Sequence, residues 1–196
     1  FENQTNFLKR LANSREEKEK EILEYAGKIE SIRNKLGDIT GTLEEKRGTV
    51  MGLEGIAGRI YFESLAFIVP KRFEFDGRSR NPAKDEFNCL LNYAYGILYS
   101  LVEKACIIAG LDPYLGFIHT DNYNKKSLVF DLIDLFRNYA DQTVVYLFSQ
   151  RKVKQEFFDV IKGGFMLNKD GKAVLISALN EMLEKTQRYK GRNIKN

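Results

Sequence analysis

The sequence predicts an all-α fold, and three observations support this prediction. The 196 residues include only three prolines, Pro70, Pro82 and Pro113, so long stretches lack the residue that most often breaks a helix. Apolar side chains recur at helical spacing along these stretches. The composition, 43% hydrophobic and 30% charged, is typical of a folded globular protein. We expect no strand of consequence, no internal repeat and no low-complexity segment.

The expected helices run over residues 6–36, 43–69, 85–109, 127–137, 142–150 and 172–188. The first should be interrupted, because Ser14 and Glu17 have the spacing of a capping box that would start a new helix. Asp85 is the expected N-cap of the third helix. We expect residues 1–41 to form an N-terminal helical segment that leads into a larger helical domain over residues 42–196.

Charge and hydropathy limit the class of protein. The net charge is +4, and beyond Arg137 there are eleven basic and six acidic residues. This excess favours a polyanionic partner, although ordinary solvated lysines explain it equally well. No apolar run approaches the ~18 residues of a membrane span, and no signal peptide opens the chain. Cys89 and Cys106 lie in apolar helical stretches, which indicates buried thiols in a cytoplasmic protein. The opening at Phe1 suggests a fragment whose upstream portion is missing.

The stretch from Ser127 to Arg137, SLVFDLIDLFR, gives the first sign of a functional site. Seven of its eleven residues are apolar, so a helix here should be largely buried. Asp131 and Asp134 nevertheless lie in its middle, and both would project from one side of the helix. An ionised carboxylate in an apolar interior needs a partner or a metal. We therefore expect a cationic group beside these two acids.

The second long helix contains a similar feature. Its apolar centre includes an isolated acid, Glu54, with Gly52, Gly55 and Gly58 close to it in the sequence. Each glycine costs about 1 kcal/mol relative to alanine in a helix interior, which favours close approach of another helix or of a ligand. Close helix packing alone would explain the glycines, but it would not explain Glu54.

Two loops are candidates to complete a site. Residues 70–84 combine basic side chains with Phe73 and Phe75, a composition that suits contact with phosphates and bases and equally suits an ordinary solvated loop. The basic residues of this loop are Lys71, Arg72, Arg78, Arg80 and Lys84. His119, the single histidine, lies just before the acidic helix. A lone histidine is more often a hydrogen-bonded structural residue than a metal ligand.

The candidate metal ligands are Glu54, His119, Asp131 and Asp134. Carboxylates suit magnesium or manganese, and an imidazole shifts the preference towards manganese. The alternative is a set of buried ion pairs, because Asp134 and Arg137 have the spacing of one. Glu54 and Arg59 have that spacing less ideally. On spacing alone, the metal site and the ion pairs are equally supported.

Four segments of the chain together resemble a known family. They are EGIAGRIYFESL, RSRNPAKDEFNCLLNYAYGILYSLV, GLDPYLGFIHT and SLVFDLIDLFR. Their motif positions are Glu54, Gly55, Gly58, Arg59 and Tyr61, then Asp85, Asn88, Leu91, Asn92 and Tyr93, then Gly116, Phe117 and His119, and last Asp131, Leu132, Asp134 and Arg137. In this order the motifs resemble the CRISPR-associated spacer-acquisition integrases and endonucleases, the Cas-one family. Two departures, Asn81-Pro82 in place of a doubled proline and Gly58 in place of alanine, touch no proposed ligand.

The resemblance implies that Glu54, His119 and Asp134 bind a divalent Mg or Mn ion, with Asp131 as a further acidic group beside them. It implies a helical catalytic domain, here without the N-terminal β-rich domain of the family. The implied partners are DNA, as spacer precursor and CRISPR repeat, a second copy in a homodimer, and the small second Cas protein of the family. No membrane is expected. The residues expected to bind DNA are Arg59, Arg78, Arg80, Lys84, Arg137, Arg151 and Lys152.

The expected function is a metal-dependent DNA endonuclease and integrase that inserts new spacers into a CRISPR array by transesterification. The 3′-hydroxyl of a captured DNA end would attack a phosphodiester at the repeat border. Two alternatives remain open. One is a non-catalytic helical DNA-binding or scaffolding module whose acids form salt bridges. The other is a free-standing structure-specific DNase or transposon integrase that needs no CRISPR array.

Overall fold

The computed structural model describes residues 1–119, 124–189 and 192–195. The α-helices are α1 (Glu2–Asn13), α2 (Glu19–Asn34), α3 (Leu43–Ile68), α4 (Glu86–Ile108), α5 (Ser127–Ile133), α6 (Arg137–Ser149) and α7 (Lys169–Leu183). Short 3₁₀ turns cover Glu16–Lys18, Lys35–Asp38, Lys71–Phe73 and Gln155–Phe157. The strands are β1 (Phe158–Ile161), β2 (Gly164–Leu167), β3 (Thr186–Tyr189) and β4 (Arg192–Lys195). The fold is therefore mostly helical, as the sequence predicts.

The starts of the two longest helices follow from side-chain caps. Asp85 caps α4, because its carboxylate accepts a 2.7 Å hydrogen bond from the Asn88 backbone N–H, as predicted. At the start of α3, the Thr42 hydroxyl accepts from the Glu45 N–H, and the Glu45 carboxylate accepts from the Thr42 N–H. This reciprocal capping box satisfies two backbone donors that a helix start leaves without partners.

The capping box predicted at Ser14 and Glu17 is wrong. The Ser14 hydroxyl instead donates a 3.0 Å hydrogen bond to the Leu11 carbonyl, at the end of α1. The 3₁₀ turn that follows has no side-chain cap. A serine hydroxyl can bond locally to either of the helices that flank it, and here the preceding helix uses it.

Two antiparallel hairpins, β1–β2 and β3–β4, were not expected from the sequence. Each strand has four residues, too short to give a clear alternating pattern. The β1–β2 hairpin packs on the loop before α4, where the Phe165 N–H donates a 2.8 Å hydrogen bond to the Ala83 carbonyl. A Cβ at Gly164 would lie 2.1 Å from that carbonyl oxygen, so this close approach requires glycine.

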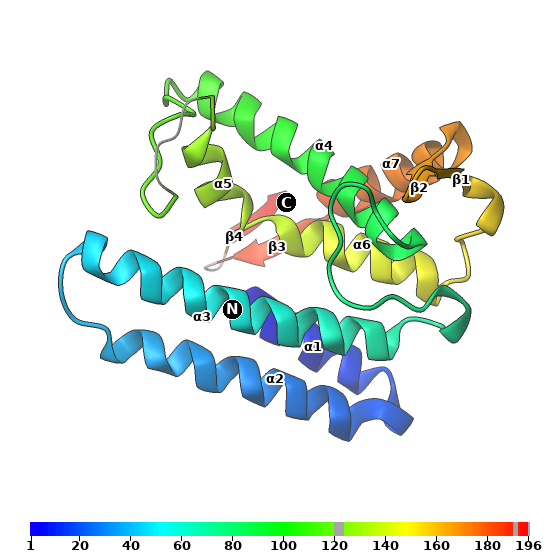
Figure 1. Cartoon of the computed structure of the whole chain (residues 1–196), viewed down its shortest axis with the longest axis horizontal. Helices are drawn as coiled ribbons and strands as arrows, with labels where there is room; N and C mark the ends of the chain where they lie inside the picture. Colours follow the sequence, from blue (N-terminus) through cyan, green and yellow to red (C-terminus); the bar gives the residue numbers. More distant parts are fainter. Residues whose placement is uncertain (120–123, 190–191, 196) are drawn as a thin grey trace.

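The helices form two groups (Figure 1). The first group contains α1, α2 and α3, which lie side by side, and the second contains α4, α5, α6 and α7 with the β1–β2 hairpin. The two groups meet along one junction, and helix α1 packs on α6 there. None of the described helices is long and apolar enough to cross a membrane.

Side-chain hydrogen bonds cross this junction at several places in the described chain. The Asn3 amide donates to the Leu135 carbonyl at 3.1 Å, Arg15 donates to the Ser149 hydroxyl at 2.8 Å, Arg47 donates to the Phe117 carbonyl at 3.1 Å, and the Tyr61 hydroxyl donates to the Asp141 carboxylate at 2.9 Å. Of these four bonds, that between Tyr61 and Asp141 is buried and the other three are exposed. It should therefore be the least weakened by competition from water.

Candidate functional site

A bend in the chain brings Asp134 to the junction. The sequence predicted one buried helix over residues 127–137, but α5 ends at Ile133 and α6 begins at Arg137. Leu135 and Phe136, which the prediction placed in the core, are 59% and 40% exposed. Asp134 is therefore the C-cap of α5. Its carboxylate oxygen Oδ1 lies 2.9 Å from Arg137 Nη1, so the ion pair considered as an alternative is present.

Glu54 approaches this bend from α3, on the other side of the junction. Its carboxyl group faces that of Asp134 closely enough for the two to interact. Burial raises the pKa of Glu54, and the negative charge of Asp134 raises it further, while the charges of Arg137 and His119 oppose both effects. The residue as a whole is exposed, so only its carboxyl end is sheltered. In the described chain no ion pair joins Glu54 to Arg59, and that alternative is wrong.

Asp131 has a different environment from Asp134. Its Oδ1 lies 2.6 Å from His119 Nδ1 and accepts a 3.0 Å hydrogen bond from the His119 N–H. Its Oδ2 accepts from the backbone N–H groups of Phe117 and Ile118. Burial works against the charged carboxylate, but the hydrogen bonds from the His119 ring and from these backbone groups together lower the pKa of Asp131. Asp131 therefore shapes the loop and orients the imidazole ring, leaving His119 Nε2 as the ring nitrogen available to a metal.

The loop that carries His119 is held from two sides. A Cβ at Gly116 would lie 2.5 Å from the Ser127 Cβ and 2.7 Å from the His119 carbonyl oxygen, so the loop approaches the start of α5 as closely as glycine allows. From α3, Arg47 donates a 3.1 Å hydrogen bond to the Phe117 carbonyl. The imidazole consequently has a defined position between the two helical groups.

The donor set suits a divalent ion. Asp134 Oδ1 is buried and has no hydrogen-bond donor, since Arg137 contacts it without hydrogen-bond geometry. Two adjacent carboxyl groups repel one another when both are ionised, and a cation between them removes this repulsion. Oxygen donors with one imidazole match magnesium or manganese. Across the described residues, however, no three His, Cys, Asp or Glu side chains are arranged to hold a metal ion. The predicted ligands are neighbours, but they do not surround a common point.

The glycines of α3 do not mark close helix packing. A Cβ built on Gly52, Gly55 or Gly58 would meet no atom within 4 Å. The sequence left two explanations open, close approach of another helix or of a ligand, and the first does not hold among the described residues. This stretch of α3 is open on the side where the glycines lie.

Arg78 is the predicted DNA-binding residue with the most contacts in the structure. Its guanidinium donates a 2.8 Å hydrogen bond to Asn88 Oδ1 and lies 5.2 Å from the Tyr95 ring centroid. Burial lowers the pKa of Arg78, and the nearby charges of Arg80 and Arg137 contribute in the same direction. Arg137 also stacks on Tyr95, at 5.4 Å. The structure therefore brings two guanidinium groups to one tyrosine ring, beside Asp134.

The remaining predicted DNA-binding residues lie at the surface. They are Arg59 on α3, Arg80 and Lys84 in the loop before α4, and Arg151 and Lys152 after α6. Arg151, Arg72 and Lys154 line a hollow of about 500 Å³, so part of the basic surface is concave. Lys152 lies over the Tyr146 ring at 5.0 Å.

The expectation that Phe73 and Phe75 contact nucleic acid bases is wrong. Both rings are buried, at 2% and 7% exposed. Phe75 stacks on Phe87 with a centroid distance of 4.2 Å, and Phe73 contacts Phe148 edge-on at 5.0 Å. These rings anchor the basic loop to the core, because an aromatic ring has a lower free energy when it is buried than when it is exposed to water.

Sequence reasoning missed Asp141 and Tyr95. Asp141 is 3% exposed, and both of its carboxylate oxygens accept hydrogen bonds from tyrosine hydroxyl groups, one of them from Tyr95 at 2.6 Å. The signal was present, since Asp141 is an isolated acid beside an apolar helical run, as Glu54 and Asp134 are. The same reasoning, applied to α6, would have found it.

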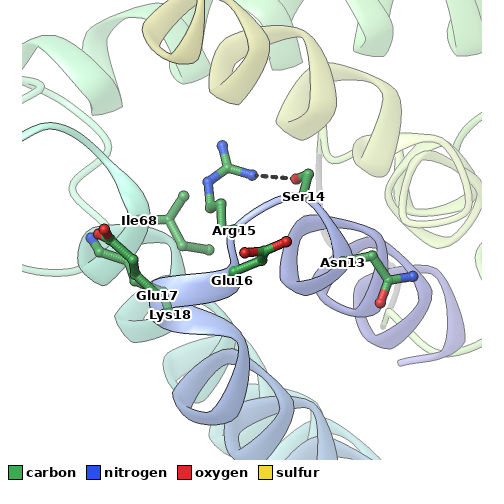
Figure 2. Close-up of a pocket in the computed structure, with 7 residues that line it drawn as sticks. All are labelled: Asn13, Ser14, Arg15, Glu16, Glu17, Lys18 and Ile68. Carbon is green, nitrogen blue, oxygen red and sulfur yellow. Dashed lines mark hydrogen bonds between the residues drawn. The ribbon is translucent and has the colours of Figure 1, made fainter.

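A larger hollow, of about 550 Å³, lies away from these residues (Figure 2). It opens at the turn between α1 and α2 and is lined by Asn13, Ser14, Arg15, Glu16, Glu17, Lys18 and Ile68. The Arg15 guanidinium points to the Ser14 hydroxyl, with a 3.0 Å hydrogen bond. None of the predicted site residues lines this hollow, so the candidate site remains the junction.

These features define a class of protein: a mostly helical domain whose two helical groups meet at paired carboxylates, an imidazole and two guanidinium groups. Comparison with known proteins then gives the family. The sequence model of the family described as CRISPR associated protein Cas1 matches residues 1–181. The chain belongs to this family, which confirms the resemblance stated above.

Several relatives are similar over most of the chain. A CRISPR-associated endonuclease Cas1 of Archaeoglobus fulgidus is 33% identical over 198 residues, which cover 97% of this chain and 57% of the relative. One from Saccharolobus solfataricus is 39% identical over 128 residues, 65% of this chain and 40% of the relative. The chain thus spans about half the length of these two curated relatives.

Solved structures share the fold. A Cas1 protein from Thermotoga maritima has a TM-score of 0.74 and 28% identity, covering 94% of this chain and 55% of its own. A casposase bound to an integration product has a TM-score of 0.82 and 24% identity, covering 98% of this chain and 52% of its own. The latter similarity concerns the fold alone.

Proposed function

We propose that this chain is the helical catalytic part of a metal-dependent DNA endonuclease and integrase that inserts spacers into a CRISPR array. The observation that carries the proposal is that Glu54 faces Asp134 across the helical junction, with His119 near enough to act on its charge, in a Cas1 family member. The name of the Archaeoglobus relative, an endonuclease, supports the same class of activity.

In this proposal the three residues have distinct roles. Glu54 and Asp134 supply carboxylate oxygens, and His119 supplies Nε2, to hold a Mg or Mn ion. When bound, the ion supplies a Lewis acid that polarises the scissile phosphate and stabilises the leaving oxygen. Asp131 keeps the imidazole ring in its tautomer and orientation. Arg137 places a positive charge beside the phosphate, where charge develops in the transition state.

The reaction is an in-line exchange of phosphodiester bonds. The 3′-oxygen of the incoming DNA end forms a bond to phosphorus while the bond to the 3′-oxygen of the cleaved strand breaks. The proton of the attacking hydroxyl leaves to solvent, and the departing oxygen gains one. Basic residues around the site would bind the DNA backbone without reading sequence. They are Arg59, Arg78, Arg80, Lys84, Arg151 and Lys152.

The test is half-site integration of a labelled DNA with a free 3′-hydroxyl into a supercoiled plasmid, in manganese. We expect Glu54→Ala, His119→Ala and Asp134→Ala to lose integration and branched-DNA cleavage by at least about 100-fold, while gel-shift binding of DNA is retained. Glu63→Ala, an exposed acid on the same helix α3, is the matched control. Full activity of the three site variants would reject the proposal.

The same assay distinguishes a CRISPR spacer integrase from a free-standing integrase or nuclease that needs no array. A plasmid with a CRISPR repeat should accept the DNA end at the repeat border, and a plasmid without the repeat should accept it poorly. Equal integration into both plasmids would instead identify an integrase or nuclease that needs no array.

The Asp134–Arg137 ion pair favours a second candidate function, a DNA-holding module in which the acids only form salt bridges. This module would bind DNA but not manganese, so its thermal unfolding would be unchanged by the metal or by a chelator. The proposed enzyme should gain stability when manganese is added, because a ligand that binds only the folded state stabilises it.

The proposal extends to partners. A chain of a Cas6-RT-Cas1–Cas2 complex has a TM-score of 0.82 and 23% identity to this chain, a similarity of fold. We propose that this chain works as a homodimer with a small second Cas protein in the cytoplasm. Light scattering of the protein alone and with that partner measures both associations.

A further inference from the structure

A buried acid lies at the junction beyond the candidate ligands. Asp141, on α6, is 3% exposed. Its Oδ2 accepts a 2.9 Å hydrogen bond from the Tyr61 hydroxyl of α3, and its Oδ1 accepts a 2.6 Å hydrogen bond from the Tyr95 hydroxyl of α4. One carboxylate therefore joins three helices, and it uses both of its oxygens to do so.

This junction contact shares its elements with the candidate site. Tyr61 follows Glu54 by about two turns of α3, which places both side chains on nearly the same face of that helix, about 10 Å apart along its axis. Asp141 follows Arg137 by one turn of α6 and therefore lies on the same face as Arg137. Any movement of α3 relative to α6 at Tyr61 would also move Glu54 relative to the bend at Asp134.

The contact also supports the arginines. The hydroxyl of Tyr95 is bonded to Asp141, and the ring of Tyr95 carries the guanidinium groups of Arg78 and Arg137 at 5.2 and 5.4 Å. The two guanidinium groups carry like charges and repel one another. The face of the Tyr95 ring and the nearby Asp141 carboxylate offset that repulsion. Asp141 is therefore the anion around which this positive pair is arranged.

A buried charge at this position is unfavourable for folding. Burial raises the pKa of Asp141 to about 6, although the hydrogen bonds from Tyr95 and Tyr61 and the charges of Arg137 and Arg78 work in the opposite direction. The carboxylate is thus mostly ionised at neutral pH, in a place where a neutral side chain would avoid the desolvation penalty.

We infer that Asp141 is a positioning residue of the candidate site, which holds Glu54 opposite Asp134 and the Arg78–Arg137 pair beside them through the hydroxyl groups of Tyr61 and Tyr95. The inference rests on the proposed function only in calling this site a metal site. The holding of α3 against α6 is a claim about the fold, and it is measurable without metal.

The experiment compares Asp141→Asn and Tyr61→Phe with the parent protein by two readouts. The first is the distance distribution between spin labels at Ile56→Cys on α3 and Tyr146→Cys on α6, both exposed positions. Cys89 and Cys106 are buried and should stay unlabelled. The second is the manganese dissociation constant, from the signal of the free ion. Thr143→Val is the matched control, because Thr143 is buried on α6 and its hydroxyl bonds only within that helix.

We expect both variants to broaden the distance distribution and to weaken manganese binding by about tenfold, the size found when a residue that orients a metal ligand is lost. Thr143→Val should change neither. An unchanged distribution in folded Asp141→Asn and Tyr61→Phe would overturn the inference, even if both variants are less stable. Absence of manganese binding by the parent protein would instead overturn the proposed function, and the distance measurement would still decide the inference.

Discussion

Asp131 and Asp134 lie one helical turn apart at the end of α5, yet their surroundings differ. The Asp131 side chain is 7% exposed and accepts hydrogen bonds from the His119 ring and from three backbone N–H groups. The Asp134 side chain is 31% exposed, touches Arg137, and has a buried oxygen without a hydrogen-bond donor. The first acid has its bonding capacity filled by the protein, and the second does not.

The difference separates two roles that spacing alone does not separate. A carboxylate with several hydrogen bonds stabilises the structure that donates them, so Asp131 holds the loop that carries His119. Asp134 Oδ1 makes an ion pair with Arg137 but accepts no hydrogen bond with good geometry, so it keeps acceptor capacity that a cation could use. Around α5 the number of hydrogen-bond donors that contact each carboxylate distinguishes Asp131, the positioning acid, from Asp134, the candidate ligand. Their positions in the sequence do not.

The largest expected effect is on manganese affinity, and it tests the difference between Asp134 and Asp131. Asp134→Asn should reduce manganese affinity by more than about 100-fold, because it removes a direct ligand, whereas Asp131→Asn should reduce it by about 10–100-fold, because it only loosens His119. Titration of each purified variant with manganese measures both. Equal losses in the two variants would mean that donor count does not distinguish these acids.

The second prediction uses pH to compare Asp131 with Asp141. The pKa of Asp131 is lowered, so the stability it contributes is present above pH ~4 and is lost as the pH falls further. The pKa of Asp141 is raised to about 6, so its contribution is full below pH ~4 and is lost as the pH rises through 6. Relative to the parent protein, Asp141→Asn should therefore gain about 3 kcal/mol of unfolding free energy between pH 4 and pH 7.

Urea unfolding of the parent protein and the two variants at several pH values measures these slopes. Asp131→Asn should lose stability relative to the parent as the pH rises, the opposite direction from Asp141→Asn. Parallel curves for the two variants would show that the two carboxylates are not in opposite environments.

A smaller effect is expected at the loop that Asp131 holds. Gly116→Ala places a Cβ 2.5 Å from the Ser127 Cβ, and relief of such overpacking typically costs about 1–3 kcal/mol. Gly96→Ala is the matched control, because its Cβ would meet nothing within 4 Å and α4 should gain up to about 1 kcal/mol. Thermal unfolding measures both, and a loss of stability in the control alone would contradict the close packing of the loop.

The sequence predicted the helices better than the site. The long helices α3 and α4 were predicted almost to their ends, because their caps and apolar periodicity are local features. The bend after Ile133 was not, since an apolar run such as Leu132 to Phe136 gives no local sign that its last residues turn outward. The hairpins were missed because strands of four residues are too short to show an alternating pattern. The division after residue 41 stays a prediction.

Within the site, the sequence identified the residue types but not their partners. An isolated acid in an apolar helix drew attention to Glu54 and Asp134, which are neighbours in the structure, and their role as ligands stays a prediction. The same rule placed Asp131 among the candidate ligands. Its actual bonds, to the backbone of residues 117–119, depend on how a loop folds against α5. That contact is set by tertiary packing around Gly116, which spacing along the chain does not reveal.

The smallest expected effect lies at the other end of α5. Lys126 Nζ is 2.6 Å from Glu103 Oε1, and the two side chains are 28% and 25% exposed. Because solvent screens such a pair, Glu103→Gln should lower the unfolding free energy by at most about 1 kcal/mol, and manganese affinity should not change. Thermal unfolding and manganese titration of this variant test whether α5 matters as a whole or only through its acids. If Glu103→Gln weakened manganese binding as much as Asp131→Asn, the orientation of the entire helix would set the site, and the hydrogen bonds of Asp131 would not explain its role.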